Sequence, residues 1–277
     1  EMRGAGQTWL RRRASGAGET VSGGGVPVWV RGAVPDRGVD PMRFVPKEEE
    51  HRSERCEEIF RIQSHGLARR LRHARCERAV VGISGGLDST LALLVTVRTF
   101  DLLQLDRSGI IGITMPGFGT TDRTYHNALE LMRGLGITVR EIPIRDACLQ
   151  HMRDIGLDPA DRSAAYENAQ ARERTQILMD VANKEGGLVV GTGDLSELAL
   201  GWATYNGDQM SMYGVNASVP KTLVRHLVKW VADTEHDPAT RATLLDIIDT
   251  PVSPELHPAD ADGKIAQKTE DLVGPYE

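Results

Sequence analysis

Four short apolar runs alternate with helical segments through the middle of the chain, and this alternation restricts the fold more than any other feature. The runs lie at 79–83, 110–114, 137–142 and 188–190. Runs with little polar alternation are typical of parallel strands that are buried on both faces. Such strands are joined by crossover helices, which cover the two faces of the sheet. The pattern therefore predicts an α/β fold built on a doubly wound parallel sheet.

Helices are expected before, between and after these strands. Between residues 48 and 76, apolar side chains recur at near-helical spacing with charges between them, which predicts an amphipathic helix. Further helices are expected near 88–99, 122–133, 164–183, 220–232 and 238–247. In a sheet of this kind, ligands bind beyond the carboxyl ends of the strands, where the strand order reverses. Motifs that directly follow a strand are therefore the first candidates for a site.

Composition and charge exclude several classes of protein. The 277 residues include 33 Lys+Arg and 39 Asp+Glu, which gives a formal net charge of −6. A dedicated nucleic-acid binder usually has a basic face, so nucleic acid is not an expected partner. No apolar run reaches the roughly 18 residues that would cross a bilayer, so no membrane partner is expected. Cys56, Cys76 and Cys148 are odd in number and widely spaced, which favours a reducing cytoplasm.

The chain divides into two parts of different composition. Residues 1–46 are rich in Gly and Arg and have no helical or strand periodicity, so we interpret them as an unassigned segment: a disordered leader, a remnant of a preceding domain or a sequence artefact. Residues 47–277 contain all the predicted strands and form the expected nucleotide-binding domain.

A glycine-rich loop, Gly82-Ile83-Ser84-Gly85-Gly86-Leu87-Asp88-Ser89-Thr90, follows the first strand and opens a helix. Glycines let the backbone approach an anion closely, and the N–H groups at a helix N-terminus attract it. An acid beside a phosphate site is repulsive unless a cation lies between them, so Asp88 implies Mg²⁺. The alternative is a plain glycine turn in which Asp88 caps the helix.

This loop differs from two commoner phosphate motifs. No Lys follows the glycines as in a Walker loop, and there is no Gly-x-Gly-x-x-Gly. The loop resembles the pyrophosphate loop of enzymes that split ATP into AMP and pyrophosphate, whose fold is the Rossmann-like adenine nucleotide alpha-hydrolase-like fold. That superfamily includes NAD synthetases, GMP synthetase, asparagine and argininosuccinate synthetases, and tRNA thiolation enzymes. The loop alone does not choose among them.

A second block of sequence makes the choice. It follows the fourth strand as Gly191-Thr192-Gly193-Asp194-Leu195-Ser196-Glu197 and continues through Trp202 and Tyr213-Gly214-Val215-Asn216-Ala217 to Pro220-Lys221-Thr222. This block resembles the signature of NAD synthetases, in particular the synthetase domain of the long glutamine-dependent bacterial type. The resemblance runs from about Arg55 to Glu277.

The resemblance implies a ligase that forms a carbon–nitrogen bond. Its substrates are ATP with Mg²⁺, deamido-NAD⁺, and ammonia that is used directly or derived from glutamine. The nicotinate carboxylate attacks the α-phosphate of ATP to form an acyl-adenylate, and pyrophosphate leaves. Ammonia then attacks the activated carbonyl, and AMP leaves. Catalysis of this kind rests on positioning and charge neutralisation.

The resemblance also assigns roles to single residues. Asp88, Glu197 and Lys221 are the expected catalytic residues, and Asp88 and Glu197 are the expected Mg²⁺ ligands. The residues expected to bind deamido-NAD⁺ are Asn168, Arg172, Glu197 and Trp202. The residues expected to bind ATP are Gly82, Ile83, Ser84, Gly85, Gly86, Leu87, Asp88, Ser89, Thr192 and Lys221.

Each of these roles has a simpler structural alternative. Glu197 lies three residues after Asp194 at a helix start, which is also the spacing of a capping box. Lys221 is alternatively a solvated lysine, Trp202 a core aromatic, and Arg172 part of a solvated helix. We interpret Arg174, two residues beyond Arg172, as structural because it points elsewhere. The weaker matches are 115–121, beside adenine in the family, and 250–256, a loop that closes near ATP.

The long family members carry an N-terminal glutaminase domain with a catalytic cysteine. Residues 1–46 contain no cysteine and are too short for it, so we expect a glutaminase domain in the native full-length chain. The family also runs on beyond Glu277 with a late lysine, so we expect the C-terminus to be truncated. Family members are expected to be homo-oligomers. The alternatives left open are another pyrophosphate-loop ATPase, of the GMP synthetase or tRNA thiolation type, and an inactive nucleotide-binding fragment.

Overall fold

The computed structural model describes residues 44–45, 48–161 and 163–250. Its elements, in chain order, are α2 (Glu49–Ala74), β1 (Ala79–Gly82), α3 (Leu87–Leu103), the 3-10 turn η1 (Arg107–Gly109), β2 (Ile110–Thr114), α4 (Asp122–Gly134), β3 (Thr138–Glu141), α5 (Arg145–Asp154), α6 (Ala164–Glu185), β4 (Leu188–Gly191), α7 (Leu195–Leu200), β5 (Tyr213–Gly214), α8 (Lys221–Thr234) and α9 (Pro238–Ile248).

The five strands form one sheet in the order β3-β2-β1-β4-β5, and every pair is parallel. The chain winds from β1 outward to β3 and then crosses to β4 on the other side of β1. The strand order therefore reverses between β1 and β4, which pair from Ala79↔Leu188 to Val81↔Val190. The predicted doubly wound parallel sheet is confirmed, and its switch point lies between these two strands.

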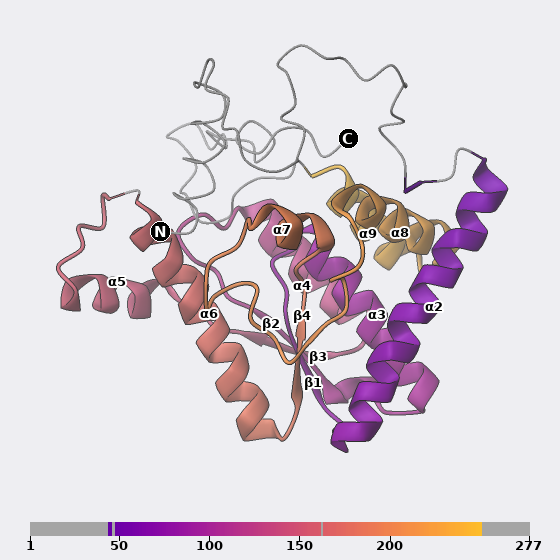
Figure 1. The fold of residues 1–277 in the computed structure, drawn as a ribbon, viewed down its shortest axis with the longest axis horizontal. Coiled ribbons are helices and arrows are strands. Elements are labelled where there is room, and N and C mark those ends of the chain that lie inside the picture. Colours follow the sequence, from indigo (N-terminus) through magenta and orange to yellow (C-terminus); the bar gives the residue numbers. More distant parts are fainter. Residues whose placement is uncertain (1–43, 46–47, 162, 251–277) are drawn as a thin grey trace, which may run out of the picture.

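Alternate residues of the strands pack into two separate cores. Val81 and Val190 face a core shared with α2, α3, α4, α8 and α9. Val80 and Val189 face the opposite core, which α5 and α6 complete. In Figure 1, α6 lies on one side of the strands and α2 with α3 on the other. The covered faces explain why these strands appear in the sequence as continuous apolar runs.

The elements that periodicity located best are those with a buried face. β2 has the predicted bounds, whereas α3 and α6 extend beyond the predicted ends. α3 continues to Leu103 because Phe100 is fully buried in the core. α6 continues to Glu185 and ends at Gly186, which takes a left-handed conformation with φ of 65°. The six-residue α7 and the two-residue β5 had no predicted bounds because they are too short to show a period.

The two predicted terminal segments fall largely outside the described residues. Of the expected leader at 1–46, the structure describes Phe44 and Val45, and Val45 packs into the larger core. Of the predicted loop at 250–256, it describes Thr250. Among the described helices, none combines the length and apolar character needed to cross a membrane. Cys56, Cys76 and Cys148 are all free thiols.

Candidate functional site

The candidate site lies where β1 and β4 end. The glycine loop leads from β1 into α3, and Thr192–Asp194 leads from β4 into α7. Because β1 and β4 are paired neighbours, these two connections leave the sheet side by side. The motifs that the sequence placed more than a hundred residues apart therefore meet at one edge of the sheet.

Hydrogen bonds within the glycine loop hold its shape. Ser89 Oγ donates to Gly86 O at 3.0 Å, and Gly86 N donates to Ser84 Oγ at 3.2 Å. Ser84 N donates to Ser89 Oγ at 3.3 Å. Gly86 is the N-cap of α3, and no side chain among the described residues caps this helix end. The 17-residue α3 therefore presents the positive end of its dipole to the loop.

Gly85 is required by two independent features of the loop. Its φ of 86° lies in the left-handed region, where a side chain is strained. A Cβ at this position would also collide with the backbone carbonyl of Thr124 in α4. The glycine thus permits the loop to press against the first turn of α4.

We expect Gly85→Ala to lower kcat/KM for ATP by on the order of 10²-fold, because a loop displaced by the Thr124 carbonyl would no longer position the phosphates that its sequence predicts it to bind. Gly156→Ala is the matched control, since Gly156 has φ of 69° and open space around its Cβ position. The control carries the cost of the backbone strain alone, about 1–2 kcal/mol of stability. Urea unfolding and ATP kinetics on both variants measure the difference. Equal kinetic losses in both would contradict the collision.

Three carboxylates surround one lysine beside this loop. Lys221 Nζ lies 2.6 Å from Asp88 Oδ2, 2.9 Å from Asp194 Oδ2 and 3.1 Å from Glu197 Oε1. Lys221 is only 7% exposed and Asp194 is 0% exposed. The interpretation of Lys221 as a solvated surface lysine is therefore wrong. We call Asp88, Asp194, Glu197 and Lys221 the acidic cluster.

The starts of α7 and α8 are tied together, and this places Lys221. Leu195 N donates to Val219 O at 3.0 Å, just before Pro220, the N-cap of α8. Lys221 N, in the first turn of α8, donates to Ser196 Oγ at 3.0 Å. The side chain of Lys221 then reaches from α8 to the beginning of α3, which carries Asp88.

Asp194 and Glu197 form the capping box that the sequence offered as the simpler alternative. Glu197 N donates to Asp194 Oδ1 at 2.8 Å, and Asp194 N donates to Glu197 Oε2 at 3.2 Å. Each carboxylate keeps its second oxygen for Lys221. The capping box and the acidic cluster are thus made by the same two residues, and capping fixes both side chains toward the lysine.

Burial and mutual repulsion set the charge state of the cluster. Burial raises the pKa of Asp88, and the nearby Asp194 raises it further, against the lowering effect of Lys221. Burial likewise raises the pKa of Glu197 to about 7. Burial opposes the charge of Lys221, but the surrounding Asp88, Glu197 and Asp194 together raise its pKa. Asp88 and Glu197 therefore bind protons more readily than free carboxylates do, while Lys221 keeps its charge.

The acidic cluster has the donor set of a cation site. One oxygen from each of Asp88, Asp194 and Glu197 lies within 4.8 Å of the others. Asp88 Oδ1 is buried and receives no hydrogen bond from the described residues. Asp88 also sits in the first turn of α3 rather than at its N-cap, so the interpretation of Asp88 as a helix cap is wrong. Carboxylate oxygens are the ligands that Mg²⁺ prefers.

Asp194 is the site residue that sequence reasoning gave no binding role. Its signal was present, because it directly follows Gly191-Thr192-Gly193 at the end of β4, one of the two strands at the switch point. The i,i+3 spacing of Asp194 and Glu197, however, indicates a capping box and by itself no binding role. Its complete burial beside Lys221 could be seen only after α8 was placed against α7.

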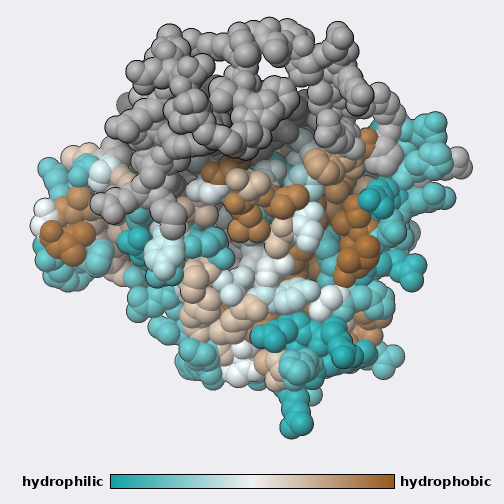
Figure 2. Space-filling view, viewed as in Figure 1, coloured by the Kyte–Doolittle hydropathy of each residue, from teal (hydrophilic) through white to brown (hydrophobic). Residues whose placement is uncertain are grey.

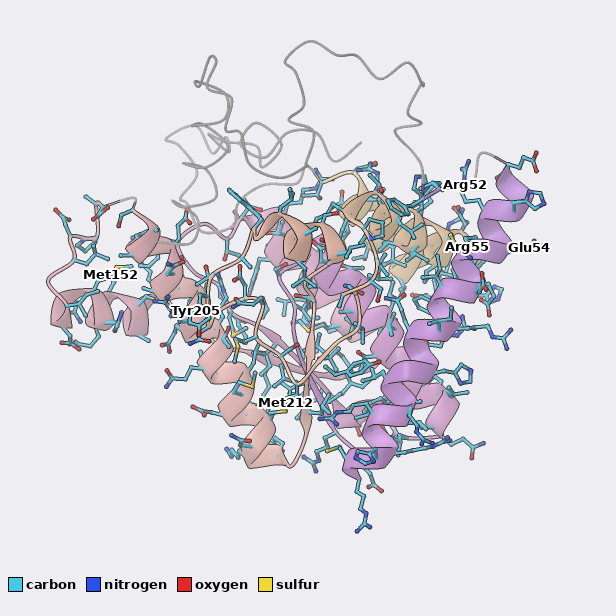
Figure 3. The ribbon with its side chains drawn as sticks, viewed as in Figure 1. Arg52, Glu54, Arg55, Met152, Tyr205 and Met212 are labelled. Atoms are coloured by element: carbon cyan, nitrogen blue, oxygen red, sulfur yellow. The ribbon has the colours of Figure 1, made fainter. Side chains whose placement is uncertain are left out.

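The remaining predicted residues line a neighbouring part of the same edge. Asn168 Oδ1 accepts from Thr204 Oγ1 at 2.8 Å. Arg172 Nε donates to Tyr205 O at 3.2 Å, and Figure 3 shows Tyr205 beside α6. Asn168 and Arg172 thus share the face of α6 that holds the loop after α7. Both lie apart from the contacts of the acidic cluster.

Trp202 and Arg174 differ in what they contact. Trp202 N donates to Glu197 O at 2.9 Å, and the half-buried side chain belongs to neither core formed by the described residues. The interpretation of Trp202 as a core aromatic therefore finds no support. Arg174 Nε donates to Met115 O at 3.3 Å, which fits the structural role expected for it. That bond fixes the start of the 115–121 segment to α6.

Apolar side chains gather on the surface next to the site. Figure 2 shows them over α7, where Leu198 and Leu200 are more than half exposed and Leu195 is partly exposed.

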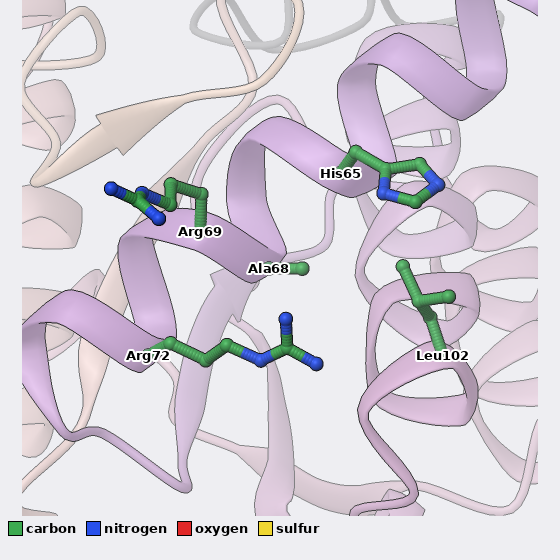
Figure 4. A pocket seen from close by; sticks show the side chains of 5 residues that line it. All are labelled: His65, Ala68, Arg69, Arg72 and Leu102. Atoms are coloured by element: carbon green, nitrogen blue, oxygen red, sulfur yellow. The ribbon is translucent and has the colours of Figure 1, made fainter.

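A separate hollow of about 280 Å³ lies between α2 and α3 and is lined by His65, Ala68, Arg69, Arg72 and Leu102. Figure 4 shows its basic side chains on α2. It shares no residue with the loops after β1 and β4, so the candidate site remains at the sheet edge.

The fold and the site together define a class of protein. A parallel five-stranded sheet, a glycine loop at its switch point and an acidic cluster beside the loop are typical of an α/β nucleotide-binding domain. A family model described as NAD synthase matches residues 59–264. The chain belongs to the NAD synthase family.

Named relatives agree with this family. The chain is 47% identical over 247 residues to the glutamine-dependent NAD(+) synthetase of Mycobacterium leprae, covering 87% of this chain and 36% of the relative. Identity to the enzyme of the same name from Thermotoga maritima is 34% over 181 residues, covering 64% of this chain and 30% of the relative. The chain thus spans about a third of the length of the curated relatives it matches.

Solved structures show the same fold. The glutamine-dependent NAD⁺ synthetase of Acinetobacter baumannii, in complex with ADP, matches with a TM-score of 0.63 and 27% identity, covering 68% of this chain and 35% of that one. The NMN synthetase of Francisella tularensis matches with a TM-score of 0.66 and 24% identity, over 80% of this chain and 82% of that one. The predicted adenine nucleotide alpha-hydrolase-like fold is confirmed.

Proposed function

We propose that this chain is the synthetase part of an NAD⁺ synthetase. It amidates deamido-NAD⁺ at the expense of ATP and releases AMP and pyrophosphate. The observation that carries the proposal is the meeting of Lys221 with Asp88, Asp194 and Glu197 directly beside the glycine loop. Family membership supports the choice of reaction from among those of pyrophosphate-loop enzymes.

The glycine loop and α3 are proposed to bind the phosphates of ATP. The residues assigned to this role are Gly82 to Ser89, with Thr192 contributing from the loop after β4 and Lys221 from the start of α8. Backbone N–H groups and a helix N-terminus suit a dispersed negative charge, and no covalent nucleophile is required. The cluster supplies a cation, Lys221, that does not lose its proton at neutral pH because three acids surround it.

The residues present fit a divalent cation. Asp88, Asp194 and Glu197 would hold Mg²⁺, because their oxygens converge and the buried Asp88 Oδ1 accepts no hydrogen bond from the described residues. When bound, Mg²⁺ would neutralise charge on the ATP phosphates and on the departing pyrophosphate. Glu197 and Asp194 are oriented for this role by their capping box, which leaves little side-chain freedom to be lost.

The chemistry proposed for the first step needs positioning rather than proton transfer, whereas the second step also releases one proton. A carboxylate oxygen of deamido-NAD⁺ attacks the α-phosphate, and the bond between the α- and β-phosphates breaks. Ammonia then attacks the carbonyl carbon, the bond between that carbon and the AMP oxygen breaks, and the attacking nitrogen releases one proton to solvent. Lys221 and the N-terminal amides of α3 stabilise negative charge on the phosphates during the first step.

The test is a reaction in which each component is omitted in turn. With ATP, deamido-NAD⁺, Mg²⁺ and high ammonium, we expect NAD⁺, AMP and pyrophosphate in equal amounts. Withholding deamido-NAD⁺ or Mg²⁺ should stop all three. ATP turnover that instead requires tRNA or XMP would favour a thiolation or GMP synthetase reaction, and ATP binding without turnover would indicate an inactive fragment.

Asn168, Arg172 and Trp202 are proposed to bind deamido-NAD⁺. We expect Arg172→Ala to raise the KM for deamido-NAD⁺ by about tenfold, as for loss of one charge-assisted contact, and to leave the KM for ATP unchanged. Lys184→Ala removes an exposed charge near the end of the same helix and is the control. Steady-state kinetics measure both constants. Equal rises in the KM values for deamido-NAD⁺ and ATP would indicate that Arg172 acts only by holding the loop at Tyr205 O. They would contradict a direct contact with deamido-NAD⁺.

The supply of ammonia and the assembly of the protein are part of the same proposal. The curated relatives are named glutamine-dependent and are about three times as long as the matched segment, which supports a glutaminase as the ammonia source. We further propose a homo-oligomer, for which the exposed apolar side chains on α7 are a candidate contact. A cytoplasmic location fits three free thiols.

A further inference from the structure

Two buried amide side chains link α2 to both loops of the candidate site. Asn216 is 0% exposed, and its Nδ2 donates to Asp88 O at 2.9 Å and to Thr192 O at 3.0 Å. Asn216 Oδ1 accepts from Gln63 Nε2 at 3.1 Å. Gln63 Nε2 also donates to Val215 O at 2.8 Å. We call Gln63 and Asn216 the amide pair.

The partners of the amide pair dictate how each amide is turned. The backbone oxygens of Asp88 and Thr192 can only accept, so the atom of Asn216 that faces them must be the nitrogen. Its oxygen then faces Gln63, whose own nitrogen is required there and at Val215 O. Each nitrogen uses both of its hydrogens, so only an amide satisfies the position of Asn216.

The hydrogen bonds from Asn216 lie just beyond the last paired residues of β1 and β4. The ladder between β1 and β4 ends at the pair Val81↔Val190. Beyond it, backbone pairing does not set the separation between the start of α3, which carries Asp88, and the loop that carries Thr192. Asn216 spans that gap with two hydrogen bonds from one nitrogen atom, and Gln63 anchors it to the long helix α2.

We propose that Asn216, held by Gln63, is a positioning residue that sets the spacing between the two nucleotide-binding loops. The inference rests on the proposed function for its kinetic consequence. Neither side chain belongs to the acidic cluster. Asn216 acts through the backbone of Asp88 and Thr192, which are assigned to ATP, and Gln63 acts through Asn216. A change in this spacing moves Asp88 relative to Thr192, and misplacement by about 1 Å can cost on the order of 10²-fold in rate.

The test uses Asn216→Asp, which keeps the shape of the side chain but replaces the donor with an acceptor that faces two carbonyl oxygens. In the protein without ligands, we expect amide hydrogen exchange to accelerate about tenfold or more in both 83–90 and 192–197. In the enzyme assay, we expect kcat/KM for ATP to fall by on the order of 10²-fold while the KM for ammonium stays unchanged. That split separates loop spacing from a general loss of structure.

Gln63→Leu provides a second variant that keeps the bonds from Asn216 to both loops but removes their anchor. It should shift the same exchange and kinetic values in the same direction by less, and the double variant should not exceed Asn216→Asp alone. Thr99→Val is the matched control, because Thr99 Oγ1 makes buried bonds to Ser64 O and Val95 O at the same junction of α2 and α3. It should leave loop exchange and KM values unchanged.

The outcomes distinguish this inference from the proposed function. Unaltered exchange in both loops of Asn216→Asp and Gln63→Leu overturns the positioning role, whatever the protein catalyses. Accelerated exchange in a protein whose unaltered form makes no NAD⁺ supports the positioning role and sinks the proposed function. If Asn216→Asp does not fold, the exchange and kinetics of Gln63→Leu decide.

Discussion

Asp88→Asn is expected to remove nearly all ATP-dependent amidation without lowering stability. Asp88 contributes to the proposed Mg²⁺ site a buried oxygen that accepts no hydrogen bond from the described residues, and asparagine keeps the shape but loses the charge. We expect kcat/KM for ATP to fall by about 10³-fold, or about 4 kcal/mol of transition-state stabilisation.

The expected effect on stability has the opposite sign from that of a typical buried ion pair. Burial and Asp194 raise the pKa of Asp88, so its ionised form is disfavoured in the folded protein. Removing that charge relieves repulsion in a cluster where three acids share one lysine. The midpoint of thermal unfolding in the absence of ligands should therefore not decrease. A kinetically normal Asp88→Asn would exclude the metal role. A large loss of stability would contradict the repulsion among the three carboxylates.

Lys221→Met is expected to destabilise the protein strongly as well as to inactivate it. Met has a similar length but leaves Asp88, Asp194 and Glu197 without their shared cation. Breaking a buried ion pair on one side typically costs about 3–5 kcal/mol, because the other charge stays buried. We expect a loss of this size in urea unfolding, partly restored by millimolar Mg²⁺, which would bind the folded cluster only.

Lys229→Met on the same helix is the matched control. Lys229 forms an exposed i,i+4 ion pair with Asp233, in which Lys229 Nζ lies 2.7 Å from Asp233 Oδ1. Exposed helix pairs contribute roughly 0.3–0.5 kcal/mol, so this variant should unfold nearly as the unaltered protein does. If Lys221→Met were as mild as Lys229→Met, the burial and convergence of the acidic cluster would be contradicted.

Much of the fold could be predicted because its signals are local. The apolar runs at 79–83 and 188–190 belong to strands covered on both faces, so each run is continuous in sequence. The helix that follows the first run, α3, is buried along most of its length. α7 and β5 were not predicted, because six helical residues or two strand residues are too few to show a period.

The candidate site could be predicted only in part. Asp88, Glu197 and Lys221 lie in recognisable motifs, and the parallel sheet brings those motifs to one edge. The roles of Asp194 and Asn216 depend on which atoms face one another after folding. Asn216 is itself part of the family motif at 213–217, yet only the positions of Asp88 O and Thr192 O reveal its two hydrogen bonds.

The central claim is that a carboxylate is activated by transfer of AMP from ATP before ammonia attacks it. The most direct measurement follows oxygen from deamido-NAD⁺ labelled with ¹⁸O in the nicotinate carboxylate. If an acyl-adenylate forms, one labelled oxygen must remain on AMP when ammonia displaces it, and mass spectrometry will find AMP and NAD⁺ each carrying one label. Unlabelled AMP formed alongside NAD⁺, or AMP formed without deamido-NAD⁺, would contradict the account.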